Sequence, residues 1–322
     1  MSETVQADSD MLRLRLPASS ANLGSGFDAA AVALDFYLEI EAAAAEEFSI
    51  EATGRDAERC SRLENNLILE IYKGLLESNE RPVTPLAIRM KNEIPLGMGC
   101  GSSAAGRLAA IALADHFGGL EWSSERILAE ASTLEGHPDN ASACWLGGFV
   151  AAAREGDSEQ SRVHVARVEP PAEWRAIVAL PTEPLATSKA RAMLPECYPR
   201  ADAVANIQSA ALLGLAFAQA RGDLLRIAMQ DCIHQPYRAS ICTLLPPLLG
   251  LAGKHGILGA ALSGAGPSVL VIVKGEESVA EALAAIRAAL GDLPEPELKV
   301  CRFEAVGASQ SFMAAKPVPT KP

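Results

Sequence analysis

Three glycines alternate with apolar residues in a short segment that ends in two serines and two alanines. Glycine adopts positive φ angles and lets the backbone approach a ligand closely. The N–H groups of such a loop, together with the N-terminus of a following helix, form a site for anions such as phosphate. The segment predicts a phosphate-binding loop whose last serines can reach a phosphate oxygen or a Mg²⁺ ion. It consists of Pro95, Leu96, Gly97, Met98, Gly99, Cys100, Gly101, Ser102, Ser103, Ala104 and Ala105.

This loop differs from two well-known phosphate-binding signatures. A Walker A loop, GxxxxGK[ST], needs a Lys, and this segment contains none. A dinucleotide fingerprint needs a β-α-β context with an acidic residue for the ribose, which is not convincing here, so an NAD-binding oxidoreductase is a remote alternative. A bare GxGxG is also typical of a flexible turn before an ordinary Ala-rich helix. The loop alone therefore does not decide the function.

Three other segments carry polar residues in Gly-containing or turn-like contexts. Residues 17–28 place Asn22 and Asp28 around two glycines; Asn can donate and accept hydrogen bonds and ionised Asp only accepts, which suits an ammonium group and a hydroxyl. The same pair is typical of an Asx turn. Residues 135–140 concentrate Glu, His, Asp and Asn in six positions. Residues 262–268 form a second Gly-rich loop before an apolar strand, which alone reads as a β-turn.

Strands and helices alternate irregularly around these segments. Leucines alternate with arginines over residues 12–16, as in a half-buried strand, and residues 31–43 alternate in the same way. An Ala-rich helix begins near Ser103, and Ser123 or Ser124 can cap the next one. Other expected helices cover 65–76, 201–220 and 276–290, and other strands 86–90, 176–180, 269–273 and 299–303. We read residues 17–27 as a loop.

The mixture of elements predicts an α+β protein with two domains rather than one doubly wound sheet. The chain has 322 residues, enough for about two domains. A polar stretch over 153–161 places the boundary, which gives an N-terminal domain over 11–160 and a C-terminal domain over 161–310.

Composition narrows the function class. The net charge is −12 and no Lys/Arg run is present, so nucleic acid is a poor partner, because its binding needs a basic surface. Seven cysteines without a CxxC pair predict reduced thiols in a cytoplasmic protein. We find no secretory signal and no apolar run near the ~18 residues of a membrane span.

The segment 95–105 resembles the ATP-binding motif of the GHMP kinases, PxGxGLGSSAA, and departs from it only at Cys100, where Leu is usual. Residues 17–28 resemble PxSxANLGPGFD of the homoserine kinase branch, with Ser25 in place of Pro. Residues 135–140 resemble that branch's EGHPDN segment, near which Trp145 is larger than usual and is expected to reshape the wall of the site. Residues 262–268 resemble the third GHMP motif, and the resemblance extends from about residue 12 to 303.

The resemblance implies a fold and a reaction. The fold is the two-domain GHMP architecture, in which an N-terminal mixed α/β domain carries the phosphate loop and the C-terminal α+β domain is ferredoxin-like. The reaction is transfer of a phosphoryl group from ATP, with Mg²⁺, to the side-chain hydroxyl of L-homoserine, a step toward threonine. It also suggests a homodimer.

Roles for individual residues follow from the matched motifs. Asn22, Asp28, Asp139, Asn140 and Gly264 are expected around the amino acid substrate. Arg191 and Arg238 fall in segments that resemble the branch's STxxAR and HQPYR, and planar guanidinium groups bind carboxylates through paired hydrogen bonds. They are therefore candidates for the α-carboxylate, although either alone reads as a surface or ion-pair arginine. Asp139, Asn140 and Arg191 are the expected catalytic residues.

Two assignments stay open. Ser103 is expected to bind Mg²⁺ with an acidic residue, for which Glu130 is preferred and Glu135 competes. Asp139 is the nearest candidate for a catalytic base, but positioning with proton transfer to the phosphate itself is equally consistent. The alternatives to this function are another GHMP kinase with a different hydroxyl substrate, and a non-catalytic family member that binds ATP or an amino acid for regulation.

Overall fold

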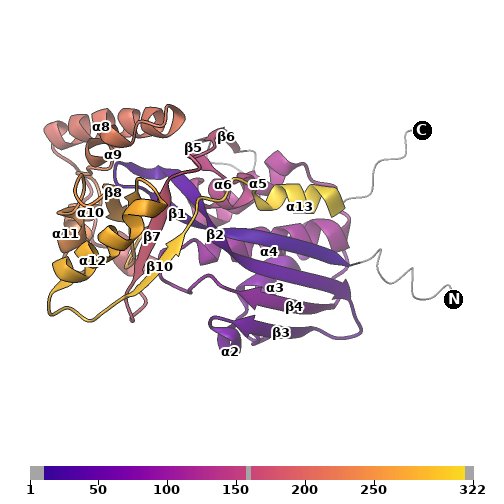
Figure 1. The fold of residues 1–322 in the computed structure, drawn as a ribbon. Coiled ribbons are helices and arrows are strands. Elements are labelled where there is room, and N and C mark those ends of the chain that lie inside the picture. The colour runs from indigo at the N-terminus through magenta and orange to yellow at the C-terminus, as the bar shows by residue number, and fades with distance from the viewer. Residues whose placement is uncertain (1–10, 157–160, 316–322) are drawn as a thin grey trace.

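Two β-sheets organise the chain, one in each half (Figure 1). The computed structural model describes residues 11–156 and 161–315. In these residues a six-stranded sheet has the order β3-β4-β2-β5-β6, with β1 paired to β2. All of its pairs are antiparallel except β3 with β4. The strands are β1 Leu12–Asn22, β2 Gly26–Ala44, β3 Ser49–Gly54, β4 Leu86–Asn92, β5 Phe149–Glu155 and β6 Arg162–Val168.

The hairpin of β1 and β2 is longer than the sequence predicted. Leu12, Leu14 and Leu16 are buried and the arginines between them are exposed, as expected. The segment read as a loop is mostly strand, however, because β1 continues to Asn22 and β2 begins at Gly26. From Leu16 to Asn22 every residue is buried, so both faces of this part of β1 are covered. A strand covered on both faces lacks the alternation by which strands are recognised.

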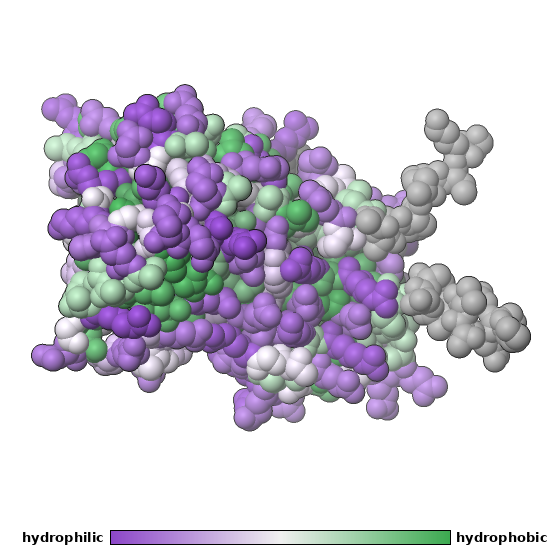
Figure 2. Space-filling model, viewed as in Figure 1, coloured by the Kyte–Doolittle hydropathy of each residue, from purple (hydrophilic) through white to green (hydrophobic). Residues whose placement is uncertain are grey.

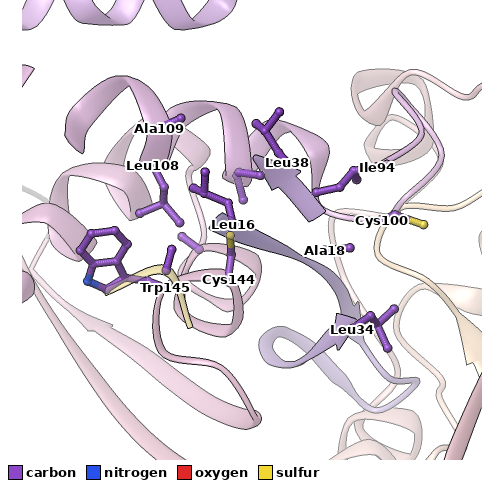
Figure 3. Packing of buried hydrophobic residues seen from close by; sticks show 14 of the residues in the cluster. Leu16, Ala18, Leu34, Leu38, Ile94, Cys100, Leu108, Ala109, Cys144 and Trp145 are labelled. Carbon is purple, nitrogen blue, oxygen red and sulfur yellow. The ribbon is translucent and has the colours of Figure 1, made fainter. Parts of the chain in front are cut away.

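Helices cover one face of the first sheet, and the Ala-rich helix α4 lies at their centre. Its residues from Ala104 to Asp115, apart from Arg107, are buried, because small side chains allow close packing. Trp145 lies in the same core, where its Nε1 donates to Ser124 Oγ at 2.8 Å (Figure 3). The helices are α2 Ala57–Cys60, α3 Leu67–Ser78, α4 Ser102–Gly118, α5 Ser124–Glu135 and α6 Asp139–Leu146.

The second sheet has the order β10-β7-β9-β8, and all of its pairs are antiparallel. In chain order this is 4-1-3-2, the arrangement of a ferredoxin-like β-α-β-β-α-β unit, so the expected fold is confirmed. The strands are β7 Arg175–Leu180, β8 Ile257–Leu262, β9 Val269–Val273 and β10 Glu297–Cys301. The helices are α7 Thr187–Arg191, α8 Arg200–Ala218, α9 Gly222–Ala228, α10 Gln235–Arg238, α11 Leu245–Leu249 and α12 Val279–Leu290, with a short 3₁₀ helix at Glu276–Ser278.

The structure moves the boundary between the domains. Strand β6 pairs with β5 from Phe149↔Val168 to Glu155↔Arg162, so a hairpin of the first sheet crosses the boundary expected at 160/161. Strand pairing places the division between β6 and β7 instead. Of the polar stretch that suggested the earlier position, residues 153–155 belong to β5, and residues 157–160 lie outside the described residues. The last helix, α13 Ala308–Ala315, then returns to the first domain and packs on β1 and α6.

Helix α8 is the exception to the expectation that no segment could span a membrane. By length and composition alone α8 is apolar enough to do so, and 28% of it is buried. A single such helix is weak support for a membrane span. It packs against α9 at the top of the second domain (Figure 1), and hydrophilic side chains cover most of the face drawn in Figure 2.

Candidate active site

A cavity of about 360 Å³ lies between the two domains and brings together the motifs that the sequence separates. The phosphate loop, the β1–β2 turn, residues 135–140, α7, α10 and the second Gly-rich loop all contribute to its wall. The residues expected in the site that line it are Asn22, Asp28, Leu96, Gly97, Gly99, Gly101, Ser102, Ser103, Ala104, Glu135, Asp139, Asn140, Arg191, Arg238 and Gly264. Trp145 is not among the lining residues, so the expectation that it reshapes the wall is wrong; it is fully buried in the core.

The phosphate loop has the backbone geometry that the glycines predicted. Gly97, Gly99 and Gly101 have φ angles of +72°, +76° and +73°, which side chains other than that of glycine rarely allow. Helix α4 begins at Ser102, and no side chain caps its N-terminus. The N–H groups of its first turn are therefore available to a ligand, and the helix dipole favours an anion there.

The second Gly-rich loop holds the phosphate loop in place. Ser263 Oγ lies 2.8 Å from the carbonyl oxygen of Gly99 and 2.8 Å from Ser20 Oγ. Gly264 donates its N–H to the carbonyl of Ala21 at 3.0 Å and accepts a bond from Asn22 Nδ2 at 2.8 Å. The two domains thus fix each other where the phosphates would bind.

Replacing Gly99 with Ala is expected to cost about 3–5 kcal/mol of unfolding free energy, in the range of severe single substitutions. A Cβ at this position would lie 2.1 Å from the carbonyl oxygen of Ser263 and 2.9 Å from that of Gly266. Gly119→Ala is the matched control, since Gly119 also has a positive φ, +61°, but nothing lies within 4 Å of the added atom. It should cost only about 1–2 kcal/mol. Denaturant unfolding checks both variants, and equal losses would contradict the clash.

The β1–β2 turn presents Asp28 in a fixed orientation. Asn22 and Asp28 have φ angles of +69° and +54°, and the N–H of Asp28 donates to Asn22 Oδ1 at 2.9 Å. The carboxylate of Asp28 accepts two bonds from Arg191, at 2.8 and 3.1 Å. Both side chains are only partly buried, so this pair can open to admit a ligand.

Arg238 is a buried cation without an anionic partner in the part of the chain that the structure describes. Its side chain is 1% exposed. Nε donates to the carbonyl of Ala190 at 3.2 Å, and Nη1 donates to His234 Nδ1 at 3.1 Å. Burial and the nearby Arg191 lower the pKa of Arg238. A buried charge is costly unless it is paired, so this guanidinium is suited to bind the anionic group of a ligand.

His234 and Phe27 hold the two arginines. His234 Nε2 donates to the carbonyl of Gly24 at 2.9 Å, which leaves Nδ1 to accept from Arg238, so the imidazole is neutral. Burial lowers the pKa of His234 in agreement with this state. The ring of Phe27 stacks on His234 and lies 5.5 Å from the guanidinium carbon of Arg238 and 5.8 Å from that of Arg191. The sequence analysis gave neither residue a role.

Asp139 has one carboxylate oxygen held and the other without a partner. Oδ1 accepts from His137 Nδ1 at 2.6 Å and from the N–H of Asn140 at 2.7 Å. Oδ2 is buried and has no hydrogen-bond partner among the described residues. Burial is the largest single influence on the pKa of His137 and lowers it, but the bond to Asp139 and the negative charges of Asp139, Asp28 and Glu135 together outweigh burial, so the pKa is raised. Asp139 lines the cavity, and Oδ2 is the oxygen left to accept a substrate hydroxyl or ammonium group once the carboxylate turns toward the cavity.

The structure favours Glu135 over Glu130 as the acidic partner of Ser103. Glu130 pairs with Arg126 at 3.0 Å and, among the described residues, is not part of the cavity wall. Glu135 lines the cavity, and a single nitrogen of Arg107 bonds both its Oε1 and Ser103 Oγ. One cationic atom can thus reach both oxygens. These are hard oxygen donors, the kind that Mg²⁺ prefers, so the two residues fit a magnesium ion.

The end of the cavity beyond the phosphate loop was missed by the sequence analysis. Its apolar residues are accompanied by three asparagines, Asn65, Asn66 and Asn92, and by Arg59, and it suits a flat aromatic base. The sequence around residues 65–68 indicated only the start of a helix. Asn66 does cap α3, by accepting from the N–H groups of Ile68 and Leu69. Lining residues in this part include Asn65, Asn66, Leu67, Ile68, Met90 and Ile94.

The two other departures from the motifs do not alter the wall chemically. Cys100 is fully buried, and burial raises the pKa of its thiol to about 12, so it replaces Leu as an apolar residue. Ser25 donates its hydroxyl to the carbonyl of Ala228 at 2.6 Å, which ties the β1–β2 turn to α9.

Comparisons with known proteins agree with this geometry. Residues 66–148 match the GHMP kinase N-terminal domain and residues 215–292 the GHMP kinase C-terminal domain. The chain is 42% identical to a homoserine kinase of Solibacter usitatus over 278 residues, covering 86% of this chain and 90% of that protein. It is 38% identical to one from Deinococcus radiodurans, covering 80% and 82%.

A solved structure shows the same fold. The crystal structure of homoserine kinase from Cytophaga hutchinsonii aligns with a TM-score of 0.76 and 25% identity, over 92% of this chain and 96% of that one. Both domains are therefore shared. The chain belongs to the GHMP kinase family and, within it, to the homoserine kinases.

Proposed function

We propose that this chain transfers the terminal phosphoryl group of ATP to the side-chain hydroxyl of L-homoserine and releases O-phospho-L-homoserine, a step toward threonine. The observation that carries the proposal is the unpaired, buried guanidinium of Arg238 at one end of a cavity whose middle is a phosphate loop. A phosphate donor and a small carboxylate-bearing acceptor fit the two parts of this cavity.

ATP would occupy the N-terminal side of the cavity. Its phosphates would accept bonds from the N–H groups of the loop and of the first turn of α4. The adenine would lie in the apolar end beside Asn65 and Asn66. Ser103 and Glu135 would hold Mg²⁺, which supplies neutralisation of the charge on the phosphates when it is bound.

L-Homoserine would bind at the Arg238 end. Its carboxylate would pair with Arg238 and with Arg191, whose bond to Asp28 is exposed enough to rearrange. Its ammonium group would lie near Asp28 and Asn22, and its hydroxyl near Asp139 Oδ2 and Asn140. The phosphate loop and Gly264, whose carbonyl accepts from Asn22, also line the cavity. The protein's main contribution is then to hold donor and acceptor in line.

Asp139 can serve the reaction in two ways. Its free Oδ2 can take the proton of the hydroxyl as the phosphoryl group is transferred, with His137 and the N–H of Asn140 holding Oδ1. Alternatively it orients the hydroxyl, and the proton passes to the phosphate. We favour the first role, because Asp139 lines the cavity and its Oδ2, buried and without a partner among the described residues, is free to accept the proton once the carboxylate turns toward the substrate.

The thiols are consistent with action in the cytoplasm, which we also propose. All seven cysteines are free. Reduced cysteines are normal in that compartment and uncommon in exported proteins.

Release of ADP by the purified chain tests the function. The assay contains Mg-ATP and, in turn, L-homoserine, L-threonine, L-serine, mevalonate and galactose. We expect turnover with L-homoserine far above the others. Turnover with another acceptor would keep the kinase and overturn the substrate. Binding of ATP without turnover of any acceptor would favour a regulatory family member.

Replacing Glu135 with Gln is expected to lower kcat/KM for Mg-ATP by about tenfold to a hundredfold, as the loss of a metal-site ligand usually does. The concentration of Mg²⁺ at half-maximal rate should rise, because Gln lacks the charge. Glu130→Gln is the matched control on the same helix, and it should change neither value by more than about twofold, since it removes only a partly exposed i,i+4 pair worth about 0.3–0.5 kcal/mol. The reverse order of effects would return the metal to Glu130.

A further inference from the structure

Arg107 is a cation in the site to which neither the motifs nor the proposed reaction assigns a role. It lies one helical turn after Ser103 on α4. Its Nη1 donates to Ser103 Oγ and, at 2.6 Å, to Glu135 Oε1. The side chains of Arg107 and Glu135 are 21% and 9% exposed, so their contact is partly sheltered from solvent, whereas the contact of Arg107 with Ser103 is exposed. An arginine held in this way beside a phosphate loop has more than a surface role.

The position of Nη1 conflicts with a metal ion at the same two oxygens. Ser103 and Glu135 fit Mg²⁺ because one point lies within reach of both, and Nη1 lies at that point. Two cations cannot share it, since like charges repel strongly in a sheltered site. Binding of the metal therefore requires the guanidinium to leave at least one of the oxygens.

An anion would lie within reach of the displaced guanidinium. Helical side chains point back toward the N-terminus of their helix, so Arg107 extends toward the start of α4. The uncapped first turn of α4 is where the phosphates of a nucleotide would bind. A guanidinium is planar and forms paired, charge-assisted bonds with phosphate oxygens, which Lys cannot do.

We propose that Arg107 exchanges partners during nucleotide binding. Without nucleotide and metal it holds Ser103 and Glu135 together, and with them it binds the terminal phosphate of a nucleoside triphosphate. The proposal rests on the proposed function, because it needs ATP in the cavity. It makes Arg107 a further phosphate-binding residue and makes metal and guanidinium competitors for one pair of oxygens.

Equilibrium binding of the non-hydrolysable analogue AMP-PNP and of ADP, followed by calorimetry with EDTA and over a series of Mg²⁺ concentrations, tests the proposal. In Arg107→Met, binding of AMP-PNP at saturating Mg²⁺ should weaken by about tenfold to a hundredfold, the usual range for a lost bond between charged groups. Binding of ADP should weaken less than about threefold, because ADP lacks the terminal phosphate. The Mg²⁺ concentration at half-saturation with AMP-PNP should fall severalfold, because the competing cation is gone.

Two further variants keep the test decisive. Arg107→Lys retains the charge but not the fork, so it should lie between the unmodified chain and Arg107→Met, and it remains informative if the Met variant does not fold. Arg126→Met removes an arginine of α5 that pairs with Glu130 on the same helix, outside the cavity wall. It should leave the affinities for AMP-PNP and ADP and the Mg²⁺ concentration at half-saturation unchanged.

Several outcomes would overturn the proposal. Equal weakening of ADP and AMP-PNP would show that Arg107 supports the loop as a whole and does not bind the terminal phosphate. An unchanged or increased Mg²⁺ requirement would show that guanidinium and metal do not compete. If the unmodified chain bound neither nucleotide, the proposed function itself would fail and the proposal with it; normal binding in every variant would remove only the role of Arg107.

Discussion

Replacing Arg238 with Met should abolish phosphorylation of L-homoserine while leaving ATP binding intact and the protein at least as stable. The guanidinium is buried and bonds only a carbonyl and a neutral imidazole among the described residues. Losing its paired bonds to the substrate carboxylate is expected to lower kcat/KM about 10²- to 10⁴-fold, since each bond to a charged group contributes about 1.5–3 kcal/mol. Stability should not fall, because an apolar residue of similar length removes an unpaired buried charge.

The measurement compares L-homoserine with 3-amino-1-propanol, which keeps the amine and the hydroxyl but lacks the carboxylate. Arg238→Met should lose activity with L-homoserine and keep whatever activity the unmodified chain has with the amino alcohol. Arg221→Met is the control, because Arg221 forms an exposed pair with Asp223 far from the cavity wall. An equal loss with both acceptors, or a clear drop in the thermal midpoint, would show that Arg238 is structural.

Replacing Asp139 with Asn should lower kcat for L-homoserine by about 10²- to 10⁴-fold, the usual contribution of a general base. Asn has nearly the same shape and can still accept a hydrogen bond from the substrate hydroxyl, but it cannot take its proton. The KM for ATP should change little, because Asp139 lies at the acceptor end of the cavity.

Single-turnover measurements separate this chemical step from product release. A fall in the single-turnover rate of only about fivefold or less would support the other route, in which Asp139 orients the hydroxyl and the proton passes to the phosphate. Asp223→Asn is the control: it shows how much the single-turnover rate changes when an exposed carboxylate outside the site is lost.

Motifs with a strict local geometry were predictable from the sequence. The alternating glycines at 97, 99 and 101 have positive φ angles, because this glycine-rich sequence allows few other backbone conformations. Arg191 and Arg238 do line one cavity, although 46 positions separate them in the chain. Matching to known motifs found both, whereas their composition and neighbours did not distinguish them from ordinary surface arginines.

Features that depend on packing between distant segments were not predictable. The choice between Glu130 and Glu135 depends on which face of α5 meets α4, and spacing along the chain does not give that. The strand character of residues 17–22 was hidden because its small side chains are buried on both faces. The apolar end of the cavity and the contact of Arg107 with Glu135 join segments between which no sequence pattern is shared.

The return of α13 to the first domain affects the order in which the chain can fold during synthesis. This helix packs on β1 and α6, and the ring centroids of Phe312 and Trp145 lie 5.7 Å apart in the core. The first domain is therefore built from both ends of the chain, with the second domain inserted between them. While the ribosome is still translating the last residues, the core around Trp145 lacks one wall. The growing chain therefore keeps an apolar surface open around Trp145 until α13 has left the ribosome, and this surface is one that a chaperone would need to cover.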